Sequence, residues 1–119
     1  MRFWGYAALF DQVDRAGDVF RAGAFAGAGE VPLLWQHRGA PVGRVSVSED
    51  ARGLRVEGDV GGPAAALVRS GALAGLSVGY RPLAVRQGVR RELRQVALVE
   101  VSLVAQPMQP LARVVSFKE

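Results

Sequence analysis

Three side chains in this sequence are of the types that together hydrolyse peptide bonds: Ser77, His37 and Glu100. A serine hydroxyl is a weak nucleophile until a base takes its proton, and a neutral imidazole can take it near pH 7. A carboxylate that bonds the other ring nitrogen fixes the tautomer of the histidine and stabilises the imidazolium that forms. The three residues therefore fit the roles of nucleophile, general base and orienting acid, provided that the fold brings them together.

Ser77 lies in a short segment that alternates as a strand does, from Gly75 to Tyr80. Gly75 and Gly79 share its face, and the apolar Leu76, Val78 and Tyr80 form the other face. We expect the two glycines to leave the face of the serine clear, so that a second chain can lie across the strand. The apolar alternation beside Ser77 suggests that a substrate binds as an added strand. In the alternative, the glycines mark a bulge or a close backbone contact, and the serine merely tolerates its position.

Glu100 is an acid within an otherwise apolar strand pattern, Val96–Val104, in which Ser102 is the only other polar residue. A carboxylate in such a place must be paired or hydrogen-bonded, because burying it alone is costly. Its partner could be the general base. Alternatively, Glu100 forms a structural ion pair with Arg94 or Arg81.

His37 is the only histidine of the chain, and it stands at the end of an apolar pattern, Val31–His37, where a strand opens into a loop. That place suits a general base. In the alternative, His37 is only a partly buried histidine at the end of a strand. Asp14 or Asp18 could also serve as a catalytic acid. Their loop is rich in turn residues, so we favour a role for both aspartates in shaping the loop.

The elements that must position these residues are mostly strands. We expect strands over Arg2–Leu9, Val31–His37, Val42–Ser48, Leu54–Val60, Leu73–Val85, Arg90–Ala105 and Leu111–Phe117, with a strand end and a helical turn over Val19–Phe25. One helix is expected over Ala64–Ser70, after Pro63 and before Gly71, with Leu67 and Val68 inward. The pattern predicts a mainly β (α+β) fold: a closed or nearly closed barrel with one or two short helices, formed by residues 1–119 as a single domain.

The composition excludes several classes of site. The chain has no cysteine, which excludes disulfides and thiolate metal sites, and its single histidine makes a zinc site improbable. We expect no metal and no cofactor. The apolar run Phe3–Phe10 is too short for a signal peptide or a membrane span, which predicts no membrane association and a cytoplasmic origin.

The formal net charge of +4 comes almost entirely from arginine, and Lys118 is the only lysine. The arginines are scattered, apart from one local cluster of Arg86, Arg90, Arg91 and Arg94. No aromatic residue is interleaved with that cluster, so we expect no specific nucleic-acid partner. A small barrel that binds nucleic acid remains an alternative that rests only on the basic charge.

Five blocks of the sequence, in order, resemble one protein family. They are Gly5-Tyr6-Ala7 with Phe10, Val13-Asp14, Gly17-Asp18 and Gly23-Ala24-Phe25; Val31 to His37 with Gly43-Arg44; Glu49-Asp50 with Gly53-Leu54; Gly71-Ala72-Leu73 with Gly75 to Tyr80; and Leu98 to Val104 with Pro107 and Pro110. With these blocks the chain resembles the prohead (capsid maturation) proteases of tailed bacteriophages. These proteases are similar in fold to the herpesvirus assemblin proteases, so the resemblance implies an assemblin-like β-barrel.

The resemblance also implies residue roles and partners. It implies Ser77 as nucleophile, His37 as general base and Glu100 as the third member, in a place where the herpesvirus relatives use a second histidine. The implied substrates are the N-terminal segment of the major capsid protein and the scaffold. Cleavage would take place in the bacterial cytoplasm, inside or associated with the procapsid of a phage or of a phage-derived gene-transfer particle, by a possible homo-oligomer. A catalytically inactive barrel module that binds scaffold or capsid protein during assembly is the alternative.

Overall fold

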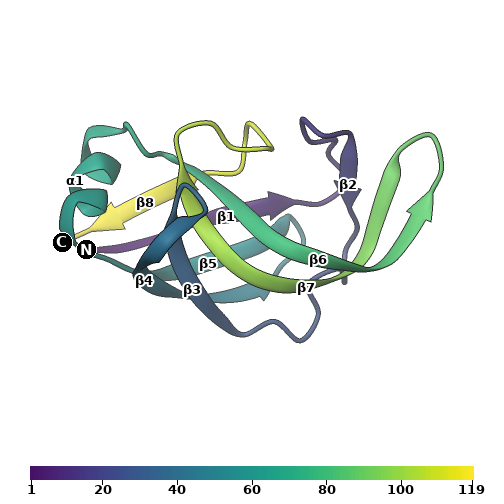
Figure 1. Cartoon of the computed structure of the whole chain (residues 1–119), viewed down its shortest axis with the longest axis horizontal. Coiled ribbons are helices and arrows are strands. Elements are labelled where there is room, and N and C mark those ends of the chain that lie inside the picture. The colour runs from purple at the N-terminus through teal and green to yellow at the C-terminus, as the bar shows by residue number, and fades with distance from the viewer.

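The computed structural model describes all residues of the chain, 1–119, and confirms the mainly β fold with one short helix (Figure 1). The elements are β1 (Arg2–Leu9), β2 (Asp18–Phe20), β3 (Glu30–Trp35), β4 (Arg38–Glu49), β5 (Gly53–Val60), α1 (Gly62–Ser70), β6 (Gly75–Gln87), β7 (Arg91–Val104) and β8 (Val114–Lys118). Each predicted strand has a counterpart. None of the helices in the structure is long and apolar enough to cross a membrane.

All the strands belong to one curled sheet in the order β2-β7-β3-β4-β5-β1-β8, and β6 pairs with β7. The two ends of the curled sheet meet only briefly. Leu76 at the start of β6 donates its backbone N–H to Ala112 O at 3.0 Å, and Val114 at the start of β8 donates to Ala74 O at 2.9 Å. Beyond Leu76, β6 pairs with no strand except β7. The curled sheet is therefore a half-barrel that is joined only along this short seam, and it opens at the residue that follows Leu76.

The strand patterns place apolar side chains inside the curl. Fully buried residues from most of the strands form the core, among them Phe3, Leu33, Leu54, Val56, Leu76, Leu93 and Leu103. Helix α1 packs Ala64, Ala65 and Val68 against this core, whereas Leu67 is half-buried at its margin. The helix ends at Gly71, whose φ of 85° is the left-handed conformation that glycine adopts at helix ends.

The turn between β3 and β4 differs from the prediction. The predicted strand ends at Trp35, and Gln36 and His37 have φ values of 54° and 62°. Two left-handed residues form the type I′ turn that matches the twist of paired strands, although non-glycine residues adopt it at a cost. Contacts with the end of β7 hold this turn: the Gln36 N–H donates to Leu103 O at 2.9 Å, and Gln36 Oε1 accepts from the Ala105 N–H at 2.8 Å.

Strands β6 and β7 continue beyond the barrel as a ribbon, at the right of Figure 1, and β2 pairs with the β7 side of this ribbon from Arg91 to Leu93. All residues from Arg81 to Arg90 are exposed, so both faces of the ribbon are in contact with solvent. The ribbon contributes to the elongated shape, whose principal extents are 42 × 27 × 25 Å. Ser77 lies near one end of β6 and the ribbon forms the other end.

Candidate active site

Ser77 lies where the barrel opens. It is the residue directly after Leu76, and it pairs across the sheet with Ser102 of β7. Directly opposed residues of an antiparallel pair project from the same face of the sheet. Ser77 is 8% exposed and lines a cavity that His37 also lines, whereas Ser102 is completely buried. Of these two serines, only Ser77 is therefore open to a substrate.

His37 and Glu100 are bonded to each other. Nδ1 of His37 lies 2.6 Å from Oε1 of Glu100. The Glu100 side chain is only 10% exposed, whereas the His37 side chain is 44% exposed. Neither Arg94 nor Arg81 forms an ion pair with Glu100, so the alternative of a structural ion pair is wrong. The pair leaves Nε2 as the ring nitrogen that is free to exchange a proton.

Ser102 is a site residue that was not predicted from the sequence. Its hydroxyl donates to Oε2 of Glu100 at 2.6 Å and accepts from the backbone N–H of His37 at 3.1 Å. Both carboxylate oxygens are thereby occupied, and the left-handed turn that carries the histidine is tied to β7. A signal was present, because Ser102 follows Glu100 by two residues and so shares its face of an apolar strand.

The two glycines beside Ser77 do not leave an open face, so that prediction was wrong. Gly79 pairs with Glu100, and a Cβ at residue 79 would overlap Oε1 of Glu100 and lie 2.9 Å from its Cδ. A Cβ at Gly75 would lie 2.7 Å from Cδ of Pro107. The glycines instead permit close approach, which was the alternative. Gly79 provides the space in which the carboxylate reaches the histidine.

The loop aspartates have structural partners. Oδ1 of Asp14 accepts the N–H groups of Ala16 and Asp18, each at 2.9 Å. The carboxylate of Asp18 accepts two hydrogen bonds from the guanidinium of Arg91, also at 2.9 Å each. Both aspartates therefore shape and anchor the loop between β1 and β2, as the sequence analysis favoured.

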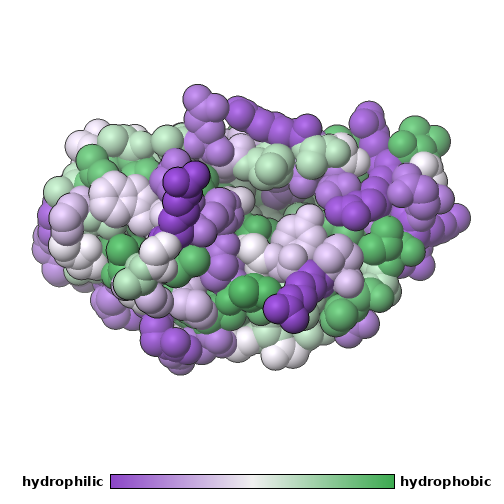
Figure 2. Space-filling model, viewed as in Figure 1, coloured by the Kyte–Doolittle hydropathy of each residue, from purple (hydrophilic) through white to green (hydrophobic).

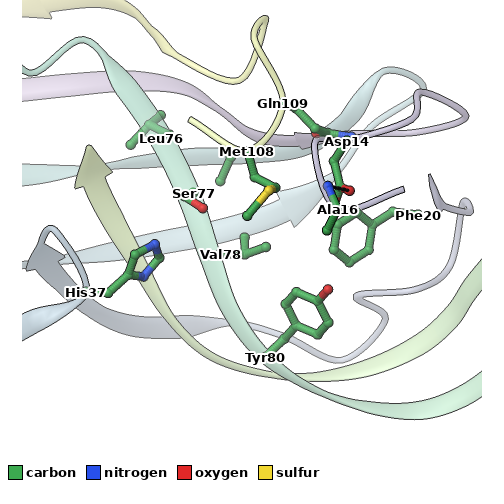
Figure 3. Close-up of a pocket in the computed structure, with 11 residues that line it drawn as sticks. Asp14, Ala16, Phe20, His37, Leu76, Ser77, Val78, Tyr80, Met108 and Gln109 are labelled. Atoms are coloured by element: carbon green, nitrogen blue, oxygen red, sulfur yellow. Dashed lines mark hydrogen bonds between the residues drawn. The ribbon is translucent and has the colours of Figure 1, made fainter. Parts of the chain in front are cut away.

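A largely apolar cavity of about 120 Å³ lies beside Ser77. Its walls are Ala7, Asp14, Ala16, Phe20, His37, Leu76, Ser77, Val78, Tyr80, Met108 and Gln109. In Figure 3, His37 lies on one side of Ser77, and Val78, Phe20 and Tyr80 lie on the other. Burial, together with the carboxylates of Asp18 and Asp14, raises the pKa of the Tyr80 phenol above its usual range, so the Tyr80 side chain is uncharged.

A second hollow adjoins the first. It is lined by Gln36, His37, Ser77, Val104, Ala105, Gln106 and Met108. Ser77 and His37 line both hollows, so a polypeptide that passes between these two residues would extend into both hollows. The Ser77 hydroxyl and the His37 ring are not hydrogen-bonded to each other in this structure (Figure 3). Such bonds between catalytic groups are often long without substrate and tighten when it binds.

Side chains suited to a metal ion do not gather anywhere in the structure. It contains no group of three or more His, Cys, Asp or Glu residues with the proximity that a metal ion needs.

Comparisons with known proteins bear on the family and the fold of the chain. The family model of the caudovirus prohead serine proteases matches residues 1–119. Among solved structures, the KSHV protease in complex with a hexapeptide phosphonate inhibitor superposes with a TM-score of 0.57 at 13% identity. The match covers 87% of this chain and 58% of the KSHV protease, and it confirms the predicted assemblin-like fold. A search of curated proteins finds no match.

Because Gly79 packs closely against Glu100, a substitution at residue 79 should disturb the His37–Glu100 contact without disturbing the fold. In Gly79→Ala the atoms nearest to the new methyl group are Oε1, Cδ and Cγ of the Glu100 side chain and not backbone atoms, so we expect the barrel to fold and the carboxylate to move away from His37. Because His37 is the only histidine, its Nδ1 proton gives a single low-field NMR resonance, which should disappear in the variant. Gly29→Ala, where nothing lies within 4 Å of the new Cβ, is the control and should keep the resonance. An unchanged resonance in Gly79→Ala would contradict this account of the site.

Proposed function

The chain belongs to the family of caudovirus prohead serine proteases, and we propose that it is a serine endopeptidase of capsid maturation in which Ser77 is the nucleophile, His37 the general base and Glu100 the orienting acid. The single observation that supports these roles best is the 2.6 Å contact between Nδ1 of His37 and the carboxylate of Glu100, next to an accessible serine. The chain spans 58% of the length of the KSHV protease, and the proposed activity rests on this chain's own residues.

The proposed mechanism gives a role to the Ser77 hydroxyl, to both ring nitrogens of His37 and to the carboxylate of Glu100. Nε2 of His37 takes the proton of the Ser77 hydroxyl while Oγ attacks the carbonyl carbon of the scissile peptide bond. Glu100 holds the Nδ1 proton and stabilises the imidazolium that forms. When the tetrahedral intermediate collapses, the C–N bond breaks and His37 returns the proton to the leaving amine. Water then attacks the acyl-serine while His37 takes its proton. The ester bond breaks, His37 returns the proton to Ser77, and the carboxylic acid product is released.

The free edge of β6 is evidence that the substrate binds as an added strand. From Ser77 to Gln87 this strand has β7 on one side and no strand on the other. An exposed edge offers unpaired N–H and C=O groups to an extended chain, which supplies affinity independently of side chains. A chain bound there would place a peptide bond next to Ser77 without any rearrangement of the sheet.

The apolar cavity beside Ser77 supports a preference for an aliphatic residue next to the scissile bond. Its 120 Å³ is below the roughly 150 Å³ of an apolar cavity that accommodates benzene. An aliphatic side chain such as that of leucine or methionine has fewer non-hydrogen atoms than benzene and suits this volume. Aromatic residues are too large for it, and charged residues would lose their hydration there.

The proposed substrates are the N-terminal segment of the major capsid protein, the scaffold, or both. The proposed place of action is the procapsid, in the bacterial cytoplasm, of a phage or a phage-derived gene-transfer particle. Family membership supports both proposals.

The function is tested by expressing the chain together with the major capsid protein and scaffold of the same genome. We expect these proteins to be trimmed by the wild-type chain and by Ser116→Ala, which alters an exposed serine of β8, and to remain whole with Ser77→Ala. Glu100→Gln should lower kcat/KM by about 10³-fold or more, because the neutral amide no longer stabilises the imidazolium. Equal trimming by wild type and Ser77→Ala refutes the mechanism. Binding without any trimming by the wild type favours the inactive assembly module.

The cavity is tested by narrowing it. Ala16→Leu adds bulk from the exposed loop wall, and we expect the preference for leucine over alanine next to the scissile bond to fall by about tenfold or more. The measurement is the profile of cleavage sites in a peptide library. Ala105→Leu, which adds the same bulk to the adjoining hollow, is the control and should leave this preference unchanged. A wild-type preference for aromatic or charged residues would contradict the assignment of the cavity.

A further inference from the structure

The ribbon formed by the ends of β6 and β7 carries positive charges that have no acidic partner within the chain. It carries Arg81, Arg86, Arg90, Arg91 and Arg94, and Glu92 is its only acid. Arg91 is bound to Asp18, and Glu92 accepts a hydrogen bond from Arg21 at 2.7 Å and lies 3.9 Å from Arg86. The remaining arginines, Arg81, Arg90 and Arg94, are exposed and form no ion pair.

Aliphatic side chains lie among these arginines. Leu83, Val85 and Val89 are exposed, and Val89 at the tip is completely so. Figure 2 shows hydrophilic and hydrophobic atoms side by side at this end of the molecule. Exposed aliphatic side chains and unpaired cationic groups that share one surface suggest a bound partner. The partner should be acidic and should also have apolar groups.

The composition favours a protein partner. Sites for single-stranded nucleic acid combine positive charge with aromatic platforms for base stacking, and no aromatic residue occurs from Arg81 to Gln95. An acidic protein segment instead matches arginine through carboxylates and matches the aliphatic side chains through its own. The free edge of β6 also continues along the ribbon, where an extended polypeptide can pair with its backbone.

The ribbon is the continuation of the strand that carries Ser77. At about 3.4 Å per residue, a substrate strand along β6 reaches Arg81 about 14 Å from Ser77 and reaches the far end of β6 about 34 Å away. We propose that the ribbon arginines bind acidic residues of the protein substrate roughly four to ten positions from the scissile bond. This inference rests on the proposed function, because it takes Ser77 as the reacting residue.

Such a site acts on binding more than on chemistry. Exposed ion pairs hold the substrate and speed its encounter, and salt screens them. Their removal should therefore raise KM and leave kcat nearly unchanged, because the contacts are the same in the ground state and the transition state. The effect should also diminish as the salt concentration rises.

The test compares the triple variant Arg81→Glu/Arg90→Glu/Arg94→Glu with wild type on a peptide library digested from a bacterial proteome. We expect wild-type cleavage sites to be enriched in Asp and Glu at the proposed positions. For an acidic peptide from that set, the triple variant should show a kcat/KM lower by about tenfold, mostly through KM. A version of the peptide with Lys at those positions should reverse the order of the two enzymes. Lys118→Glu, a charge reversal in β8 and outside the ribbon, should behave as wild type.

The outcomes separate this proposal from the proposed function. A fluorophosphonate probe contacts only the reacting serine, so it should label Ser77 equally in the wild type, the triple variant and Lys118→Glu. If all three chains are labelled equally but the wild-type cleavage sites are not enriched in Asp and Glu, the ribbon proposal alone is overturned. The same holds if the triple variant keeps that enrichment. A loss of binding to a 20-base-pair DNA duplex in the triple variant, with peptide cleavage unchanged, overturns it in favour of a nucleic-acid site. Absence of labelling in every chain refutes the proposed function itself.

Discussion

The buried carboxylate of Glu100 is the constraint on which the site depends. A carboxylate that is nearly removed from water must be satisfied on both oxygens, and here the His37 ring and the Ser102 hydroxyl satisfy them at 2.6 Å each. Glycine at position 79 is required because any side chain there would occupy the space of the carboxylate. The same hydroxyl of Ser102 receives the backbone N–H of His37, so one serine orients the acid and anchors the turn that carries the base.

The opening of the barrel places this arrangement next to a binding edge. The curled sheet is joined along one seam only as far as Leu76, and Ser77 is the first residue of β6 beyond that seam. The residue proposed as the nucleophile therefore stands between a closed core, which fixes its backbone, and a free strand edge, which can accept a polypeptide. Two hollows meet at Ser77 and His37, as expected of a site that holds a chain on both sides of one peptide bond. The ribbon extends the same edge away from the barrel.

The sequence predicted the strands well, because their alternation reports which face is buried, and it identified His37 and Glu100 as anomalies in apolar patterns. It could not predict the end of β3. The turn at Gln36 and His37 lacks the glycine that signals a left-handed turn, and contacts with β7 hold it in place. Gly79 was misinterpreted for a related reason. The missing side chain makes room for a partner on the neighbouring strand, and only the register of β6 with β7 reveals which residue uses that room.

Activation of Ser77 by the His37–Glu100 pair can be measured by reacting the folded chain with a fluorophosphonate and mapping the adduct by mass spectrometry. In this reaction the serine oxygen forms the O–P bond, fluoride leaves, and the histidine takes the hydroxyl proton. We expect one adduct, on Ser77, that forms much more slowly in Glu100→Gln. An adduct on another serine, or a rate that Glu100→Gln leaves unchanged, would contradict it.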